Sequence, residues 1–444
     1  MRIDKIEIEN FKLFAQQEFT FHPRFNLVIG ENGSGKTSLL NALAIALGAW
    51  AHTYIKDKKN LRPITENEIR EIEVDGRFNK TKLTSIKASG LLTIVDNNIR
   101  QKEVYATWNR ECHGSGETFT KGSIRHDGYS YRYNFDYLGS NILKYMEERK
   151  SRFSLPIIAF YECNRLWRPG TNLDIESSAI TKYSHFDPYI DCFGIGFDNN
   201  ENAKWLIKNE LASMQKKKIT PILQSMRNAA KAALENCTAI KFDIEQTRII
   251  VEFENGKKIP FEHLSDGQRT TVSLFCDIAR RAAILNPHLK GSACQKTEGI
   301  VLIDELDLHL HPKWQRNIIE NLRKAFPNIQ FICTTHSPFL IQSLRSGEEL
   351  IMLEGQPTAQ LANKSIEEIA QGIMGVANPQ VAARYEEMKG VAKHYLETLE
   401  EAAMSPEEKL AAFKERLASS IAPYADNPAF QAVLEMERAL KLGE

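Results

Sequence analysis

The segment GENGSGKTS, beginning at Gly30, constrains the fold of this 444-residue chain more than any other stretch. It fits the spacing Gly-x-x-x-x-Gly-Lys-Ser/Thr and lies between the apolar run RFNLVIG and the helical run TSLLNALAIALGAW. Glycines at this spacing let the backbone curl until its N–H groups point at phosphate oxygens, and the following helix adds its positive dipole end. The segment therefore predicts a strand, a phosphate-binding loop and a helix in direct succession.

The loop also contains a lysine and hydroxyl residues whose chemistry suits a polyphosphate. Lys36 would neutralise the β- and γ-phosphates, and Thr37 would ligate Mg²⁺. We expect the following residues to form the nucleotide site: Gly30, Asn32, Gly33, Ser34, Gly35, Lys36, Thr37 and Ser38. An ordinary glycine-rich turn is the alternative, and the strand and helix on either side argue against it.

A second segment, GIVLIDELDLHLHP, supplies carboxylates. Four apolar residues, Ile300 to Ile303, place Asp304 at the carboxyl end of a buried strand, where ligands collect in an open α/β sheet. Asp304 would hold the Mg²⁺ through water, and Glu305 would orient or deprotonate the attacking water. A buried Asp–Glu pair without a metal would be costly, so a purely structural role is disfavoured.

The strand IQFICTTHSP ends in a histidine, His336. A lone histidine at a strand end is more often a structural residue with its hydrogen bonds satisfied. Because it accompanies a phosphate loop and an acidic strand, we interpret His336 as a γ-phosphate contact. The predicted catalytic residues are therefore Glu305, His336 and Lys36.

Strand and helix patterns alternate along the chain, which favours an α/β fold with a largely parallel sheet. Strands are expected at IDKIEIENF, RFNLVIG, LTIVDN, SYRYNFDYL, LPIIAFY, EGIVLIDE and IQFICTTHS, and a helix at NILKYMEERKSR. Two helices are expected on either side of Pro221, followed by a hairpin that turns at Asn255-Gly256. From Ser365 the pattern changes to helices alone, and the first of these opens with a capping box of Ser365 and Glu368.

The polar turn LSDGQ precedes another helical run, which is expected to end near Leu285. Together with IDKIEIENFKLF, VIGENGSGKTSLLNALAIAL, VLIDELDLHLHP and FICTTHSPFLI, the segment LSDGQRTTVSL resembles the ATP-binding-cassette ATPases of the soluble RecF/SMC-like branch. The resemblance implies ATP and Mg²⁺ as cofactors. It also implies an α/β head with a mostly parallel sheet plus antiparallel strands, a short helical insertion and an α-helical C-terminal extension.

In that family, the LSDGQ loop of one subunit closes over the nucleotide of another, so ATP joins two subunits. The resemblance thus assigns Ser265, Asp266, Gly267 and Gln268 to a signature that acts in trans. Asp307 would begin the segment at the dimer interface. Metal ligation by His309 and His311, in the same segment, is an alternative.

The chain departs from the family pattern after the strand that ends in Tyr161. Family members carry a glutamine there that senses metal and water, whereas this chain has YECNRLWRP, in which Asn164 is the nearest amide. Asp266 stands where many members have glycine. Lys12, in NFKLF, occupies a position at which the family often places a basic residue near the phosphates.

The resemblance divides the chain into four parts. These are an N-terminal lobe (1–161), a linking loop with a helical insertion (162–237), a C-terminal lobe (238–360) and a helical extension (361–444). The insertion holds two short helices and no sustained heptads, which excludes a long coiled coil. The chain therefore resembles the compact ATPases of bacterial anti-phage systems, and the YECNRLW block and the helical tail resemble the Septu-type ATPase.

That likeness implies an ATPase that controls an HNH-type nuclease partner. The ATPase would form a homodimer or a higher even-numbered oligomer, and DNA or a phage-derived molecule would trigger it. Two alternatives remain: a RecF-like DNA-binding ATPase of DNA repair, and the motor subunit of a transporter. Basic segments that could contact DNA are Gln215–Lys218 with Lys204 and Lys208, and Lys56–Arg62. Solvated surface is the alternative for each.

Charge balance, apolar run lengths and cysteine spacing indicate the cellular compartment and the partners to expect. Lys plus Arg and Asp plus Glu both number 57, which argues against a uniformly basic surface. No apolar run approaches the roughly 20 residues that a membrane helix requires, so no membrane partner is expected. The seven cysteines form no Cys-x-x-Cys pair, and we expect reduced thiols in a cytoplasmic protein. Cys112-His113 lacks the second pair that a zinc site would need.

The apolar residues of the tail repeat at helical spacing and must be covered. We expect residues 378–444 to dock a partner or build the oligomer without taking part in ATP chemistry. The stripe comprises Leu410, Phe413, Leu417, Phe430, Val433 and Leu434. Packing of this stripe on the chain's own ATPase core is the alternative.

Overall fold

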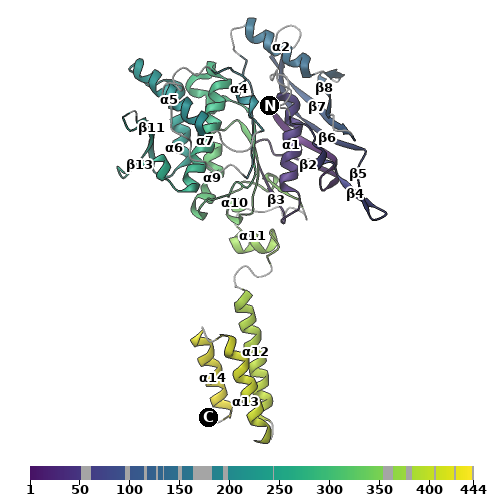
Figure 1. The fold of residues 1–444 in the computed structure, drawn as a ribbon, viewed down its shortest axis with the longest axis vertical. Coiled ribbons are helices and arrows are strands. Elements are labelled where there is room, and N and C mark those ends of the chain that lie inside the picture. The colour runs from purple at the N-terminus through teal and green to yellow at the C-terminus, as the bar shows by residue number, and fades with distance from the viewer. Residues whose placement is uncertain are drawn as a thin grey trace. The chain divides into compact units, whose positions relative to one another are not determined.

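The computed structural model divides the chain into two compact units, Met1–Ile369 and Ala370–Glu444 (Figure 1). It describes all residues except 52–61, 96–100, 115–117, 127–128, 134, 149–152, 164–182, 194–198, 244, 354–363, 377–382, 405–406, 425–426 and 443–444. No helix in the described part of the chain is long and apolar enough to cross a membrane. The finer division into four parts stays a prediction.

A five-stranded parallel sheet forms the centre of the first unit. Its strands follow the order β10 (Ile157–Tyr161), β14 (Gly299–Ile303), β15 (Ile329–Thr334), β3 (Phe25–Ile29) and β16 (Leu350–Met352). Every residue of the first four strands is buried, because elements cover both faces of the sheet. The predicted buried strands are confirmed, and they bring the phosphate loop, Asp304 and His336 to the same edge of the sheet.

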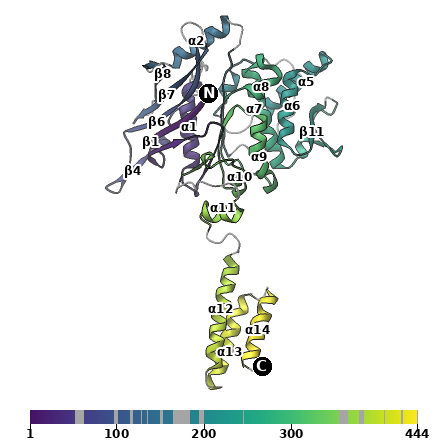
Figure 2. The same cartoon turned by 180° about the vertical axis from the view of Figure 1, so that it is seen from behind.

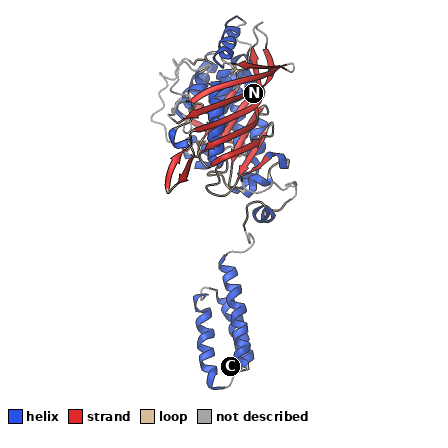
Figure 3. Ribbon diagram, turned by 90° about the vertical axis from the view of Figure 1, so that its right-hand side faces the viewer, coloured by secondary structure: helices blue, strands red, loops and turns tan. Residues whose placement is uncertain are grey.

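A second, antiparallel sheet of six strands contributes most of the remaining N-terminal structure (Figure 3). Its order is β2 (Phe14–Thr20), β1 (Arg2–Phe11), β6 (Leu83–Val95), β7 (Gln101–His113), β8 (Thr118–His126) and β9 (Tyr129–Tyr133). The expectation of a parallel sheet with added antiparallel strands is confirmed. Strands β7 and β8 were not predicted from the sequence. Polar or charged residues separate the buried ones along β7, and none of the described side chains of β8 is buried.

Helix α1 (Lys36–Ala51) lies between the two sheets, where it contacts β6 and β7 as well as β10, β14 and β15 (Figure 1). All its residues except Thr37 are buried. This position explains why the run TSLLNALAIALGAW has no polar face, since a helix that is apolar all round must be covered on all sides.

On the other face of the parallel sheet, α7 (Asp266–Leu285) packs against β10 (Figure 2). Helix α9 (Pro312–Ala325) joins β14 to β15, and α10 (Pro338–Gln342) follows β15. The short helix α8 (Ala293–Lys296) precedes β14. The predicted end of α7 at Leu285 is confirmed.

The helical insertion also forms as expected. Helices α5 (Asn199–Gln215) and α6 (Pro221–Ala233) lie on either side of the turn before Pro221, and α4 (Asp187–Ile190) precedes them. A small sheet of β11 (Cys237–Asp243), β12 (Arg248–Phe253) and β13 (Lys258–Pro260) follows. The predicted hairpin turn is confirmed, and Gly256 adopts a φ of +77° there.

One predicted strand, SYRYNFDYL, is wrong in its second half. The strand ends at Tyr133, and α2 (Phe135–Glu148) begins two residues later. Leu138 and Ile142, four residues apart, are both buried, which is the spacing of one helix face. A hairpin of β4 (Glu71–Val74) and β5 (Arg77–Lys80) was also not anticipated.

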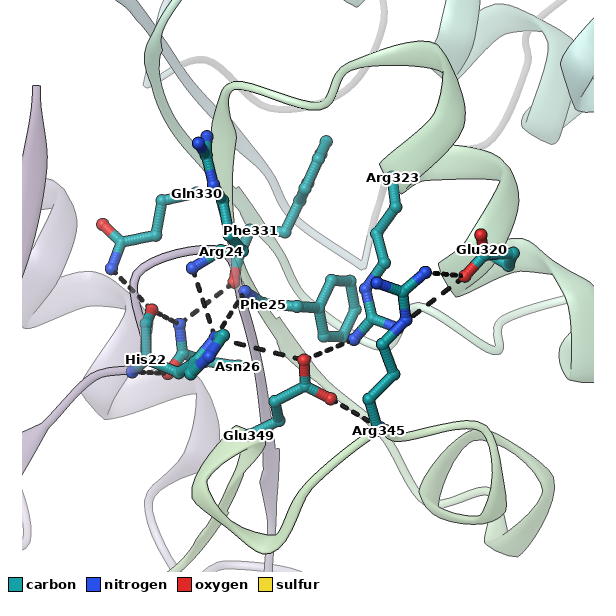
Figure 4. A network of polar contacts seen from close by, with 10 residues as sticks. All are labelled: His22, Arg24, Phe25, Asn26, Glu320, Arg323, Gln330, Phe331, Arg345 and Glu349. Atoms are coloured by element: carbon teal, nitrogen blue, oxygen red, sulfur yellow. Dashed lines mark hydrogen bonds and ion pairs between the residues drawn. The ribbon is translucent and has the colours of Figure 1, made fainter. Parts of the chain in front are cut away.

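A polar network ties the amino end of β3 to α9 and to the turn before β16 (Figure 4). Asn26 accepts from the His22 N–H at 2.7 Å and donates to the His22 carbonyl at 2.9 Å. Buried Glu349 accepts from Arg323 at 2.6 Å and from the Arg345 N–H at 2.7 Å. These contacts lie at the amino ends of the strands, away from the phosphate loop, and therefore stabilise the sheet and not the nucleotide site.

The second unit is helical and has its own small core. It comprises the end of α11 (Ile366–Gly372), α12 (Ala383–Ala403), α13 (Glu407–Ile421) and α14 (Pro428–Leu442). The predicted capping box before α11 is confirmed, because the Ser365 N–H donates to Glu368 at 2.6 Å and the Glu368 N–H donates to the Ser365 hydroxyl at 3.2 Å. The core of the unit consists of Tyr395, Leu399, Leu417, Ile421 and Leu434.

Candidate active site

The loop before α1 is shaped for a phosphate group. Gly33 and Gly35 adopt φ values of +85° and +103°, which only glycine adopts without strain. A Cβ at Gly30 would lie 2.5 Å from the Ser34 hydroxyl oxygen, so the loop closes tightly over that residue. The Ser34 hydroxyl is buried and has no hydrogen-bond partner in the structure. A phosphate oxygen would satisfy this donor, and the loop therefore fits the group that the sequence predicts.

Lys36 spans the loop, with its ammonium donating to the carbonyls of Gly30 and Glu31, both at 2.8 Å. Lys36 and Ser38 are buried at the start of α1, whereas Asn32 and Gly33 are exposed at the tip of the loop. The ammonium is thus held beside the concave side of the loop. Charged phosphate oxygens bind an ammonium group more strongly than neutral carbonyls do, so a phosphate can replace these two contacts.

Thr37 and Asp304 meet although 267 positions separate them, because β14 lies near the loop after β3. The Thr37 hydroxyl donates to Asp304 Oδ2 at 2.9 Å, and Asp304 is only 2 % exposed. Mg²⁺ typically takes one or two protein oxygens and completes its shell with water and phosphate. This pair therefore fits an Mg²⁺ site. Among the described residues, no group of three His, Cys, Asp or Glu side chains is arranged to hold a metal ion.

Glu305 follows Asp304 in an unusual backbone conformation, with a φ of +51°. Left-handed backbone costs a non-glycine residue about 1–2 kcal/mol. The Glu305 N–H donates to the Thr334 hydroxyl at 2.7 Å, and its carbonyl accepts from the Leu308 N–H at 2.9 Å. These bonds turn the chain sharply after β14, so the half-buried Glu305 side chain leaves the strand beside Asp304.

The residues at the end of β15 hold those at the end of β14. The Thr335 hydroxyl donates to Asp307 at 2.5 Å and accepts from the Ser337 N–H at 2.9 Å. His336 lies between them with its side chain exposed. His336 was predicted from the sequence as a site residue, whereas Thr334 and Thr335 were not. Two successive threonines at a strand end, directly before the histidine, could have indicated from the sequence that their hydroxyls lie at the site.

The signature residues form the amino end of α7. Ser265 caps the helix: its hydroxyl accepts from the Gln268 N–H at 3.4 Å, and its own N–H donates to the Gln268 side chain at 3.1 Å. Ser265 and Asp266 are exposed, and Asp266 pairs with Arg269. Gly267 is buried, and a Cβ there would lie 2.3 Å from the His309 carbonyl oxygen. Glycine is therefore required at this position by close packing against the segment after Asp307.

Lys12 makes contacts other than those expected from a phosphate ligand. Its ammonium lies 3.5 Å from the Glu68 carboxylate, which also accepts two hydrogen bonds from Arg62 at 2.6 and 3.0 Å. Arg62 in turn donates to Asn41 of α1 at 2.8 Å. This cluster of Lys12, Arg62 and Glu68 lies beside the first turns of α1, and the sequence had singled out Arg62 only as the end of a basic segment that could contact DNA.

Glu162, which follows β10, was also missed. Burial raises the pKa of Glu162, while Arg62 opposes the rise and Asp304 adds to it. The carboxylate therefore lies within electrostatic reach of Asp304. Asn164, the predicted replacement for the family glutamine, lies outside the described residues, whereas Glu162 and Cys163 of that segment both lie within electrostatic reach of Asp304.

A buried ionic network connects β10 to α7. The Tyr161 hydroxyl donates to Asp277 at 2.7 Å, and Arg280 and Arg281 each donate to the same carboxylate at 2.6 Å. Although burial opposes it, Arg281 and Arg280 hold the pKa of Asp277 well below its ordinary value. Because the Tyr161 carbonyl accepts the Asp304 N–H at 2.8 Å, this network links the acidic strand to the signature helix.

The basic candidates for a DNA contact differ in their surroundings. Lys204 pairs with Glu201 at 3.0 Å, and Lys208 lies over the Tyr183 ring at 5.2 Å. The three lysines of 216–218 are exposed at the turn after α5. Of the segment Lys56–Arg62, only Arg62 is among the described residues, and it pairs with Glu68.

A parallel sheet with a glycine-rich loop before α1 and an acidic strand beside it defines a P-loop ATPase head. A family model described as an AAA ATPase domain matches residues 1–341, which is more than half of the chain. The chain therefore belongs to this ATPase family.

Two relatives show how far the similarity extends. A Retron Vc95 probable ATPase of Vibrio cholerae is 27 % identical over 389 residues, covering 80 % of this chain and 74 % of its own length. The Septu protein PtuA of Bacillus mycoides is 28 % identical over 364 residues, and the match spans 80 % of this chain but 41 % of the relative. The predicted likeness to the Septu-type ATPase is confirmed.

Two further similarities are shorter or weaker. A RecF protein of Staphylococcus carnosus is 32 % identical over 84 residues, which is 19 % of this chain. Among solved structures, an SMC head bound to a ScpA domain covers 79 % of this chain and 94 % of its own length, at 15 % identity and a TM-score of 0.42. A score this low adds nothing to the topology described above.

Proposed function

We propose that this chain is the ATP-hydrolysing subunit of an anti-phage defence system, in which nucleotide-dependent dimerisation controls a partner nuclease. The observation that carries the proposal is the contact between Thr37 and Asp304 beside a loop with an unsatisfied Ser34 hydroxyl. The similarity to a Septu protein and a retron ATPase over 80 % of the chain supports the defence setting. A cytoplasmic location remains part of this proposal.

Within the proposed reaction, each residue has a separate task. Lys36 binds the phosphates in place of the carbonyls of Gly30 and Glu31, and the loop N–H groups complete the phosphate contacts. Thr37 and Asp304 hold Mg²⁺, which supplies neutralisation of the phosphate charge. Glu305 orients the attacking water and accepts its proton, and His336 contacts the γ-phosphate.

The signature completes the site from a second subunit. Ser265 and the Gly267 backbone contact the γ-phosphate bound by the other subunit, and Asp307 lies at the interface between the two. Hydrolysis removes the shared phosphate and loosens the dimer. The exposure of Ser265 and Asp266 in the single chain supports this arrangement.

The roles of Lys36 and Glu305 can be tested separately. Lys36→Ala is expected to abolish ATP binding, because the phosphate charge loses its counter-ion. Glu305→Gln is expected to bind ATP normally and to lose hydrolysis, because the amide cannot accept a proton. Titration calorimetry and phosphate release measure the two properties, and Lys121→Ala, an exposed lysine on β8, serves as control. Equal loss of affinity in both variants would contradict the proposal.

We further propose that residues 378–444 dock the nuclease or build the oligomer. The second unit has its own core, and Val433, Met436 and Leu440 of α14 are exposed at helical spacing. Of the predicted stripe, Leu417 and Leu434 lie in that core, whereas the side chains of Leu410 and Phe413 lie outside the described set.

Truncation before Asn378 tests the role of residues 378–444. We expect the shortened chain to bind and hydrolyse ATP but to lose its partner or its higher assembly, which native mass spectrometry of the complex purified with its operon neighbours would show. If the shortened chain is insoluble or cannot bind ATP, the second unit is part of the ATPase core and this part of the proposal is wrong.

A RecF-like DNA-binding ATPase is the second candidate, favoured by the exposed lysines 216–218 and by the short RecF match. It predicts salt-dependent DNA binding by the chain alone, because each lysine–phosphate contact releases counter-ions. Replacing the three lysines by glutamine should then weaken DNA binding without changing ATP binding. DNA binding that is unchanged in this variant would remove the support for that surface.

A further inference from the structure

Thr334, the last residue of β15, is fully buried beside the two acidic residues that follow β14. Its hydroxyl donates to Asp304 Oδ1 at 2.6 Å and accepts from the Glu305 N–H at 2.7 Å. Its main-chain carbonyl accepts from the Leu306 N–H at 2.9 Å. One residue thus contacts three successive residues of the segment that carries the proposed chemistry.

These bonds use the hydroxyl in both of its capacities. A threonine hydroxyl has one proton, which is donated to Asp304, and its lone pairs are then available for the Glu305 N–H. Asp304 Oδ2 is held independently by Thr37 at 2.9 Å, so both oxygens of the carboxylate are engaged. The rotation of the Asp304 carboxylate is therefore restricted from two sides.

The second bond acts on the backbone of Glu305. A residue with a φ of +51° persists in that conformation only where its surroundings hold it. The Thr334 hydroxyl is the acceptor for the N–H of this residue, and the direction of the Glu305 side chain follows from its backbone conformation. Loss of the hydroxyl would release the backbone at the point where the proposed base leaves the strand.

We propose that Thr334 is a positioning residue whose hydroxyl sets the directions of the Asp304 and Glu305 side chains for hydrolysis. This inference rests on the proposed ATPase function of the site. It assigns the role to the hydroxyl, and not to the shape of the side chain. A purely structural role would instead predict that substitutions change stability and leave the rate of the folded protein intact.

Two substitutions separate the hydroxyl from the shape. Thr334→Val keeps the branched shape and removes the hydroxyl, whereas Thr334→Ser keeps the hydroxyl and removes a methyl group. For Thr334→Val we expect kcat to fall about a hundredfold, the order of effect that misplacement of a reacting group produces, with KM and ATP affinity little changed. Thr334→Ser should be less stable but retain most of its kcat. Thr297→Val, a buried threonine that accepts from Asn286 at 3.1 Å, is the matched control.

Hydrogen exchange of the nucleotide-free protein provides a readout that does not depend on activity. The amide of Glu305 should exchange faster in Thr334→Val than in wild type or Thr334→Ser, because it loses its acceptor. Should the valine variant fail to fold, Thr334→Cys, with its weakly hydrogen-bonding thiol, is compared with Thr334→Ser by the same measurements. A folded valine or cysteine variant with wild-type kcat and unchanged exchange overturns the proposal.

Failure of the proposed function has a different signature. If the wild-type chain neither binds nor hydrolyses ATP, the ATPase assignment fails. The exchange of the Glu305 amide then still decides whether Thr334 holds that backbone. If the wild-type chain hydrolyses ATP but the Glu305 amide exchanges at the same rate in Thr334→Val as in wild type, the proposed role of Thr334 is overturned and the ATPase assignment is not.

Discussion

Two helix ends in this chain are each predicted to contact a γ-phosphate, α1 that of its own subunit and α7 that of a second subunit, and they are built differently. The amino end of α1 follows a glycine loop and is buried, with Lys36 8 % exposed and the Ser34 hydroxyl unsatisfied. The amino end of α7 is exposed, and its own residue Ser265 already caps it. The first end is prepared for an anion by its own chain, whereas the second is closed by a capping box.

This difference indicates what binding must do at each end. At α1 an incoming phosphate replaces carbonyl contacts of a lysine and satisfies a buried donor. At α7 a phosphate must compete with the bond between the Ser265 hydroxyl and the Gln268 N–H, which at 3.4 Å is long and therefore weak. A loop that can release its cap at low cost suits a contact made by a second subunit.

The two ends are not independent, because the network of Tyr161, Asp277, Arg280 and Arg281 joins the sheet to α7. Three predictions test the comparison, beginning with the largest expected effect. Asp277→Asn should lower the free energy of unfolding by about 3–5 kcal/mol, because it leaves two buried arginines without their counter-ion. Urea unfolding measures the change, and the exposed Asp191→Asn is the control.

The pH dependence of this effect has a definite sign. The pKa of Asp277 is lowered on folding, so its contribution is complete above the ordinary aspartate pKa of about 4 and is lost as the pH falls through the lowered value. The difference between wild type and Asp277→Asn should therefore be constant between pH 6 and 8 and shrink in strong acid. A constant difference down to pH 2 would argue against a charged Asp277.

The second prediction concerns the signature end alone. Ser265→Arg and Lys36→Ala chains should each be inactive, but a mixture should regain hydrolysis, because one composite site of each heterodimer has both parts intact. With random exchange of equal amounts, half of the dimers are mixed and each has one working site, so about a quarter of wild-type activity is expected.

Ser265→Arg chains should still bind ATP, which distinguishes this variant from Lys36→Ala. The control is a mixture of two Lys36→Ala preparations, which should stay inactive. If subunit exchange is confirmed and activity still does not recover, either the signature acts in the site of its own subunit or both sites must act together.

The smallest expected effect lies beside the α1 end, at Glu162. Burial raises the pKa of this carboxyl, so its ionised form destabilises the folded chain at neutral pH and its protonated form does not. Glu162→Gln should therefore raise the melting temperature slightly at pH 7 and leave it unchanged below about pH 4, the usual glutamate pKa. Glu254→Gln, at an exposed position, is the control. An equal change of the melting temperature in the two variants would contradict a destabilising effect specific to the burial of Glu162.

Much of the fold could be predicted because its signals are local. The four fully buried strands of the parallel sheet, the helix that ends at Leu285, the turn at Asn255-Gly256 and the capping box at Ser365 each depend on residues within one element. The prediction was wrong at SYRYNFDYL, because its aromatic residues favour a strand, whereas the buried pair Leu138 and Ile142 has the spacing of a helix face. Strands β7 and β8 were missed because a sheet with one solvated face has a weaker apolar signal than a buried one.

The features of the candidate site also fall into those that the sequence predicts and those that it does not. The sequence by itself determined the glycine loop, the acidic strand end and the cap of α7, since backbone conformation and helix capping depend on neighbours in the chain. The tertiary structure alone decided that Thr37 meets Asp304 across 267 positions, that Tyr161 meets Asp277 across 116 and that Thr334 meets Asp304 across 30. Hydrogen bonds require atoms to lie within about 3 Å, and strand order and register, which involve the whole sheet, bring such distant residues that close.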